Sequence, residues 1–173
     1  MIKIMLSAGE VSGDLHAAAL ALELNKINRS AYLFGMGGEK MRSAGVDIKF
    51  DLTAHGTVGA VEIFKHLPHI IFGLRKMISL LKKEKPDILI LVDYQGFNMI
   101  LASYAKKLGI KTAYYIPPQE WLWGTVKGIK KVVSTIDKII CVFEEEARIY
   151  KEYGGNVTFV GNPNLDLARP TMT

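Results

Sequence analysis

The stretch Ile88-Leu89-Ile90-Leu91-Val92-Asp93 decides the fold, because five consecutive apolar residues end in an acid. A strand with one face in water alternates apolar and polar residues, whereas a parallel strand buried on both faces reads as a continuous apolar run. We therefore expect this stretch to form a central strand of a parallel sheet with helices on both faces. Ligands of such sheets bind at the carboxyl ends of the strands, so chemistry is expected near Asp93.

Short apolar runs alternate with longer amphipathic stretches on both sides of this strand, which is the pattern of βαβ units. The predicted strands are residues 2–8, 32–36, 47–50, 88–92, 112–116 and 138–143, with 158–160 as a further short strand. The predicted helices are residues 13–28, 39–44, 61–84, 97–108, 126–134 and 144–153. With right-handed crossovers, the fold class is α/β, a Rossmann-like doubly wound parallel sheet in one domain over residues 1–173.

The composition is that of one soluble globular domain, with 49% hydrophobic and 23% charged residues. The single cysteine, Cys141, lies in an apolar run, so we expect a buried strand position and a reducing cytoplasm. The N-terminus lacks the features of a secretory signal, and no apolar run approaches the roughly 20 residues of a membrane-spanning helix. The expected location is cytoplasmic, with any membrane contact peripheral. The net charge of +5 favours anionic partners, although a solvated lysine-rich surface is the alternative.

The first predicted strand runs into a turn that contains Gly9, Glu10, Ser12, Gly13 and Asp14. Its two glycines shape a strand-to-helix turn whose backbone N–H groups can face a ligand. A carboxylate at Glu10 would repel a pyrophosphate, whereas carboxylates and hydroxyls suit the hydroxyls of a sugar. The alternative is that Ser12 or Asp14 only caps the following helix.

Asp93 stands at the end of the central strand, where a carboxylate can accept the proton of a sugar hydroxyl that attacks an anomeric carbon. The alternative is that Asp93 caps the next helix or pairs with a lysine. Gln95 and Asn98 follow it, and they either orient a polar ligand or satisfy backbone groups of the loop.

Residues 114–124 follow the fifth strand with two prolines, amides and aromatics, among them Gln119 and Trp121. Such a mixture suits a cleft for a sugar or an acyl chain, although core packing of the tryptophans is equally compatible. Asn162 lies in a glycine-proline turn that we expect at the same sheet edge.

The predicted helix over residues 61–84 is more apolar than one stripe facing a sheet requires, as in Ile70-Ile71-Phe72-Gly73-Leu74. Contact with an acyl chain or a membrane surface is one explanation and ordinary core packing is the other. Pro68 is expected to kink or break this helix.

Several classes of site are absent from the sequence. The four histidines form no recognised metal-ligand spacing with Cys141 or a carboxylate, so no metal and no cofactor are expected. The chain lacks the dinucleotide fingerprint, the P-loop and a nucleophile elbow. No nucleic-acid partner is expected.

As an ordered set, seven segments resemble the lipid-A-disaccharide synthase family along almost the whole chain. The segments are residues 8–14, 35–45, 59–63, 85–87, 93–98, 114–123 and 159–163.

The resemblance implies the N-terminal half of a GT-B glycosyltransferase, on the acceptor side of a cleft, with a UDP-binding C-terminal domain absent from this sequence. It implies transfer of diacylglucosamine from UDP-2,3-diacylglucosamine to 2,3-diacylglucosamine 1-phosphate, with inversion and release of UDP, by a peripheral protein of the inner membrane. Asp93 would be the general base. Residues of the first loop and Asn98, Gln119, Trp121 and Asn162 would bind substrate.

The chain departs from the family pattern in places that concern the acceptor more than the fold. The family commonly has Asp-x-Pro-Asp-Phe-Asn where this chain has Asp93-Tyr94-Gln95-Gly96-Phe97-Asn98. Asn162 stands where a histidine is usual, and Gly124 where an arginine is usual. The alternative hypotheses are a non-catalytic module that binds an acylated sugar or lipid, and a dinucleotide-dependent oxidoreductase domain, which the missing glycine fingerprint disfavours.

Overall fold

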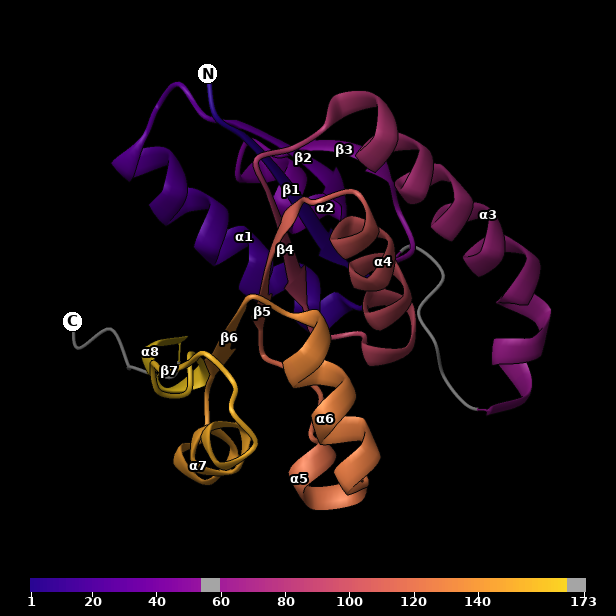
Figure 1. Cartoon of the computed structure of the whole chain (residues 1–173). Helices are drawn as coiled ribbons and strands as arrows, with labels where there is room; N and C mark the ends of the chain where they lie inside the picture. Colours follow the sequence, from indigo (N-terminus) through magenta and orange to yellow (C-terminus); the bar gives the residue numbers. More distant parts are fainter. Residues whose placement is uncertain (54–59, 168–173) are drawn as a thin grey trace.

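The computed structural model describes residues 1–53 and 60–167, which form a parallel sheet between two layers of helices (Figure 1). The strands are β1 (Lys3–Ala8), β2 (Tyr32–Met36), β3 (Asp47–Phe50), β4 (Ile88–Val92), β5 (Lys111–Tyr115), β6 (Lys138–Cys141) and β7 (Val157–Phe159). The helices are α1 (Val11–Ile27), α2 (Glu39–Ser43), α3 (Ala60–Glu84), α4 (Gln95–Lys107), α5 (Glu120–Trp123), α6 (Val126–Thr135), α7 (Glu144–Glu152) and α8 (Asn164–Leu167).

The strand order is β3-β2-β1-β4-β5-β6-β7, and every pair is parallel. The doubly wound sheet predicted from the sequence is confirmed. The strand β4 lies at its centre and is buried on both faces. Leu89 and Leu91 belong to the core beneath α3, α4, α6 and α7, while Ile90 and Val92 belong to the core beneath α1 and α2. The continuous apolar run therefore reflects a strand with no solvent-facing side.

The helix α1 approaches the sheet closely because its inner face is made of small residues. Ala17, Ala18 and Ala21 are buried against the core that also contains Leu6 and Val92. This close packing fixes the start of α1 beside the ends of β1 and β4. Cys141, the last residue of β6, is fully buried, as predicted, and belongs to the core on the opposite face of the sheet.

The helix α3 is continuous through Pro68, so of the kink or break predicted there, the break is wrong. An internal proline costs about 3 kcal/mol because it removes a backbone hydrogen bond. Met77 and Leu81 of this helix are fully buried, and burying a side chain of this kind contributes about 1.5–3 kcal/mol. Burial of the inner face thus offsets the proline. No helix of the described residues is long and apolar enough to span a bilayer.

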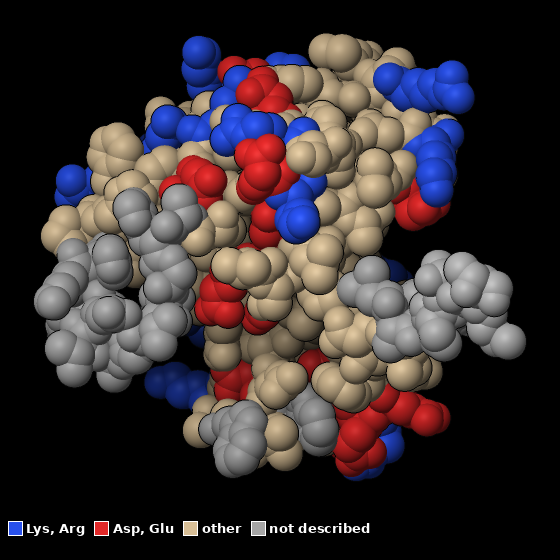
Figure 2. Space-filling model, turned by 180° about the vertical axis from the view of Figure 1, so that it is seen from behind, with Lys and Arg blue, Asp and Glu red and all other residues tan. Residues whose placement is uncertain are grey.

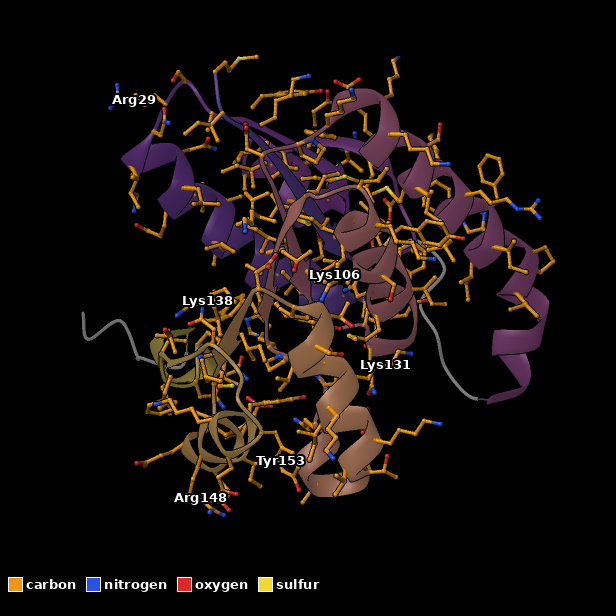
Figure 3. The ribbon with its side chains drawn as sticks, in the orientation of Figure 1. Arg29, Lys106, Lys131, Lys138, Arg148 and Tyr153 are labelled. Atoms are coloured by element: carbon orange, nitrogen blue, oxygen red, sulfur yellow. The ribbon has the colours of Figure 1, made fainter. Side chains whose placement is uncertain are left out.

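The short helices α5 and α8 were not predicted, because single turns leave no periodic pattern in the sequence. The strands β2, β3 and β4 have the predicted bounds, and the ends of the other predicted elements lie within two residues of the predicted ones. In α7, Arg148 pairs with both Glu145 and Glu152, and Figure 3 shows Arg148 on the side of this helix that points away from the sheet.

Candidate active site

The loops after β1 and β4 are in direct contact at the carboxyl edge of the sheet. The strand β1 pairs with β2 on one side and with β4 on the other, so the strand order reverses between β1 and β4. A Cβ atom on Gly9 would overlap the ring of Tyr94, and one on Gly13 would lie 3.8 Å from the Cβ atom of Asp93. Such reversal points are where open α/β sheets bind their ligands.

Asp93 leaves the central strand in a strained backbone conformation. Its φ is 51°, and that of Tyr94 is 49°. Each left-handed residue other than glycine costs roughly 1–2 kcal/mol, and strain of this kind is concentrated at functional sites. The Asp93 carboxylate is half-buried, and its Oδ1 accepts a hydrogen bond of 2.9 Å from the Tyr94 N–H. Among the residues whose side chains the structure describes, no Lys or Arg forms an ion pair with it.

Asn98 holds the backbone that carries Asp93. Its buried Nδ2 lies 2.7 Å from the carbonyl of Asp93, 3.2 Å from that of Ser7 and 3.3 Å from that of Val92. Its Oδ1 accepts a hydrogen bond of 2.7 Å from the Ser7 hydroxyl. The Tyr114 hydroxyl donates to the Asp93 carbonyl at 2.8 Å. Of the two roles considered for Asn98, the structure shows the one that satisfies backbone groups, which corrects the expectation that Asn98 contacts substrate.

Four titratable groups interact around this point. Burial raises the pKa of Glu10, and repulsion from Asp93 adds to that rise. Burial lowers the pKa of His16, while the negative charge of Asp93 opposes that change. Burial also raises the pKa of Tyr94, with a further contribution from Glu10. We call Glu10, His16, Asp93 and Tyr94 the acidic cluster.

Sequence analysis tested His16 only as a metal ligand and therefore missed its place in the acidic cluster. The spacing between Gly13 and His16 is the signal that could have revealed this position of His16. His16 follows Gly13 by three residues, so both lie on the side of α1 that faces the end of β4.

Asp14 is the clearest correction to the predicted substrate contacts. It is only 3% exposed. Its carboxylate accepts backbone N–H bonds of 2.7 Å from Gly38, 3.0 Å from Lys40 and 3.2 Å from Met41. Asp14 therefore stabilises the start of α2. It does not cap its own helix α1, which was the alternative considered.

The other residues of the first loop remain candidates for substrate contact. Ser12 is exposed in the first turn of α1, and no side-chain hydrogen bond caps this helix, so the predicted cap by Ser12 is not present. Gly9 acts through its lack of a side chain, because a Cβ atom there would overlap the Tyr94 ring, whereas a Cβ atom on Gly13 would make only ordinary contacts.

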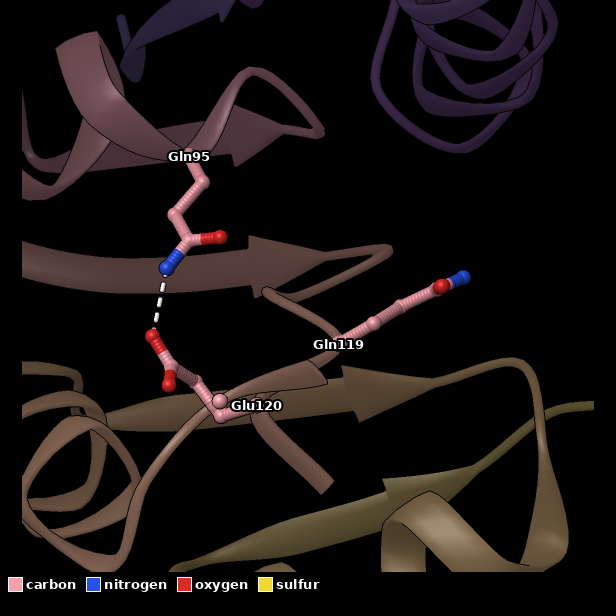
Figure 4. A pocket seen from close by; sticks show the side chains of 4 residues that line it. Gln95, Gln119 and Glu120 are labelled. Atoms are coloured by element: carbon pink, nitrogen blue, oxygen red, sulfur yellow. Dashed lines mark hydrogen bonds between the residues drawn. The ribbon is translucent and has the colours of Figure 1, made fainter. Parts of the chain in front are cut away.

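The turn after β5 forms a second part of the edge. Pro118 is buried, and its carbonyl accepts a hydrogen bond of 2.6 Å from the Tyr150 hydroxyl. Beyond it, Gln119 is exposed and lines a cavity of about 260 Å³ (Figure 4). The backbone of Trp121 lies in α5, and its side chain is outside the described residues, so its role stays a prediction.

Asn162 lies away from the acidic cluster. It follows β7, which is three strands from β4 in the sheet, a separation of about 14 Å at about 4.8 Å per strand. Its Oδ1 accepts a hydrogen bond of 3.0 Å from the Asn164 N–H at the start of α8. The structure thus gives Asn162 a local contact in a turn and does not bring it beside Asp93.

Metal-ligand clusters are not found in the part of the chain that the structure describes, where no three His, Cys, Asp or Glu side chains could hold an ion together.

Comparison with known proteins shows the family. A model described as lipid-A-disaccharide synthetase matches residues 4–172. The chain belongs to the lipid-A-disaccharide synthase family. It is 41% identical over 170 residues to the lipid-A-disaccharide synthase of Geobacter sulfurreducens, covering 98% of this chain and 44% of that protein. It is 42% identical over 160 residues to that of Nitrosococcus oceani, covering 92% of this chain and 41% of that protein. The chain therefore spans less than half the length of these synthases.

Solved structures share the fold at low sequence identity. A UDP-N-acetylglucosamine 2-epimerase from Rickettsia bellii has a TM-score of 0.67 at 15% identity, over 96% of this chain and 46% of that chain. The MurG protein of Acinetobacter baumannii has a TM-score of 0.59 at 11% identity, over 94% of this chain and 45% of that chain. The fold is that of one Rossmann-like half of a GT-B glycosyltransferase, as predicted.

Most segments that resemble the lipid-A-disaccharide synthase family follow strands at the carboxyl edge. Residues 8–14 and 93–98 form the two contacting loops, and residues 114–123 span the end of β5 and the turn after it. Residues 85–87 lie at the opposite edge, where the Asp87 carboxylate accepts a hydrogen bond of 2.8 Å from the Lys3 N–H. Residues 59–63 lie partly outside the described chain.

The structural role of Asp14 can be tested by chemical denaturation. Asp14→Ala should lower the free energy of unfolding by about 2–3 kcal/mol, because buried backbone N–H groups lose their acceptor. Ser12→Ala, two residues away and exposed, should change it by less than about 0.5 kcal/mol. Urea titrations followed by circular dichroism measure both. Equal, small effects would contradict the capping role.

The coupling in the acidic cluster can be tested by a carbon NMR titration of the Glu10 carboxyl. We expect a midpoint above the ordinary pKa of glutamate, because burial and Asp93 both disfavour its ionised form. Asp93→Asn should lower this midpoint without restoring the ordinary value, since burial is the larger cause. Asp47→Asn, at the remote strand β3, is the control and should leave it unchanged. An unchanged Glu10 midpoint in the Asp93→Asn variant would show that the two carboxylates do not interact.

Proposed function

We propose that this chain is the acceptor-side half of an inverting glycosyltransferase that makes the lipid A disaccharide. In this proposal, diacylglucosamine passes from UDP-2,3-diacylglucosamine to the 6-hydroxyl of 2,3-diacylglucosamine 1-phosphate, and UDP is released. The observation that carries it is the carboxylate of Asp93, half-buried at the end of the central strand and free of any ion pair with a Lys or Arg among the described residues. Family membership supports the choice of reaction.

Asp93 has the position of a general base. As the acceptor oxygen bonds to the anomeric carbon of the donor, its proton passes to the Asp93 carboxylate. The bond from that carbon to the UDP oxygen breaks, and UDP leaves with the electron pair. Attack from the side opposite UDP inverts the anomeric carbon. The backbone around Asp93 is held by Asn98 and Tyr114, so little reorganisation precedes the proton transfer.

Charge supports the assignment of this half to the acceptor. Glu10 and Asp93 place two carboxylates at the switch point, where a pyrophosphate would be repelled. On the face seen in Figure 2, Lys and Arg gather mainly at the upper end with some Asp and Glu among them, and further Asp and Glu lie lower down. The UDP part of the donor is therefore assigned to a C-terminal domain, in agreement with relatives more than twice as long as this chain.

The role of Asp93 can be tested by its conservative amide variant. In the full-length protein that carries this sequence, Asp93→Asn should lower UDP release about 10²–10⁴-fold, because the base is lost while the shape is kept. Glu152→Gln, an exposed acid on α7, is the matched control and should retain activity. Undiminished UDP release by Asp93→Asn would refute the base. A protein that binds acylated glucosamine and never releases UDP would instead be a non-catalytic binding module.

We further propose that α3 contacts the cytoplasmic surface of the inner membrane. Leu67, Ile71 and Phe72 are exposed by 44%, 42% and 59%. Arg75 and Lys76 are exposed next to them and would face anionic headgroups. Core packing thus explains the apolar residues on the inner side of α3. Membrane contact is proposed for the apolar residues on its outer side, which remain exposed.

Membrane contact through α3 can be tested by co-sedimentation with phosphatidylglycerol vesicles. Replacing Leu67, Ile71 and Phe72 together by Ser should weaken binding at least about tenfold, because each buried apolar side chain contributes on the order of 1 kcal/mol or more. The matched control replaces three exposed apolar residues of α1, Leu15, Leu22 and Ile27, by Ser. Equal effects of the two triple variants would exclude a specific role of α3.

A further inference from the structure

A polar cavity lies at the carboxyl edge between the start of α4 and the turn after β5. It has a volume of about 260 Å³ and is lined by Gln95, Gln119, Glu120 and Gly124 (Figure 4). Ligand pockets usually measure about 300–1,000 Å³, so this cavity is suited to part of one sugar ring rather than to an acyl chain. We call it the Glu120 cavity.

Two hydrogen bonds fix the carboxylate of Glu120. The Nε2 group of Gln95 on α4 donates to its Oε1, as Figure 4 shows. The Thr125 N–H donates to its Oε2 at 3.2 Å. Thr125 is also the N-cap of α6, where its hydroxyl accepts a hydrogen bond from Gly128. The carboxylate therefore lies beside the N-terminal end of α6, where the helix dipole is positive.

Two glycines create the space for this carboxylate. A Cβ atom on Gly124 or on Gly128 would overlap its Oε2 atom. Neither glycine has a positive φ, so the need for glycine comes from the neighbouring carboxylate and not from the backbone conformation. Hydrogen bonds from Gln95 and from the Thr125 N–H thus fix the Glu120 side chain, in space that the two glycines leave free.

The lining has a distinct ligand preference. It contains two amides, which both donate and accept hydrogen bonds, and one carboxylate, which only accepts. None of the four lining residues is cationic. A sugar hydroxyl can donate to the carboxylate and accept from an amide, whereas a phosphate would face the carboxylate with no positive side chain among the lining residues that the structure describes.

We infer that the Glu120 cavity binds an uncharged, hydroxyl-bearing part of a sugar ring and rejects phosphate at this position. This inference rests on the proposed function and deepens it. If the acceptor is a sugar 1-phosphate, its hydroxyls face Glu120 and its phosphate points away from α5. Glu120 is then a specificity-determining residue that fixes which end of the acceptor approaches Asp93.

Binding of two small sugars to the 173-residue chain tests this inference. The probes are N-acetylglucosamine and glucosamine 1-phosphate, and amide NMR shifts report both affinity and location. We expect the neutral sugar to bind at least about fivefold more tightly and to shift Gln95 and Gly124. Glu120→Gln keeps the shape and removes the charge, so it should reduce the preference to less than about twofold by strengthening phosphate-sugar binding.

The control variant is Glu144→Gln, an exposed acid at the start of α7, which should keep the full preference. Equal affinities for the two sugars in the unchanged chain, shifts confined to other residues, or no binding of the neutral sugar would each overturn the inference. Because no donor is present, the result is independent of catalysis. An inactive synthase with an intact preference would refute the proposed function alone, and an active synthase without the preference would refute this inference alone.

Discussion

The hydrogen-bonded side chain of Asn98 is the contact on which the carboxyl edge depends. It joins the ends of β1 and β4 through Ser7, Val92 and Asp93, in a place where water cannot substitute for it. A buried amide with several partners is costly to disrupt, because each partner left unpaired loses about 1–3 kcal/mol. That rigidity lets Asp93 and Tyr94 keep left-handed conformations that a looser loop would relax.

The same edge combines two environments of opposite tendency. Around Asp93, burial and the neighbouring acid raise the pKa of Glu10. Around Glu120, a backbone N–H and a side-chain amide both donate hydrogen bonds to one carboxylate. The first region therefore opposes ionisation of Glu10, and the second supplies a carboxylate with hydrogen-bond donors.

Sequence patterns predicted the architecture well because burial on two faces leaves an unmistakable apolar run in β4, and alternation with helices fixes the parallel order. Asp93 was located for the same reason, since it directly follows that run. The partners of polar side chains were not predictable in this way. Asp14 and the start of α2 are 24 to 27 residues apart, and Gln95 and Glu120 are 25 apart. Such pairs are created by the packing of distant segments, which local periodicity does not encode. Single-turn helices such as α5 are also too short to leave a periodic pattern in the sequence.

The aromatic ring of Tyr94 rests where a side chain on Gly9 would stand. The two loops therefore vary as a unit, and any residue larger than glycine at position 9 demands a smaller one at position 94. An exchange of loops between relatives would have to transplant both segments together, because a single exchanged loop would meet a neighbour shaped for a different counterpart.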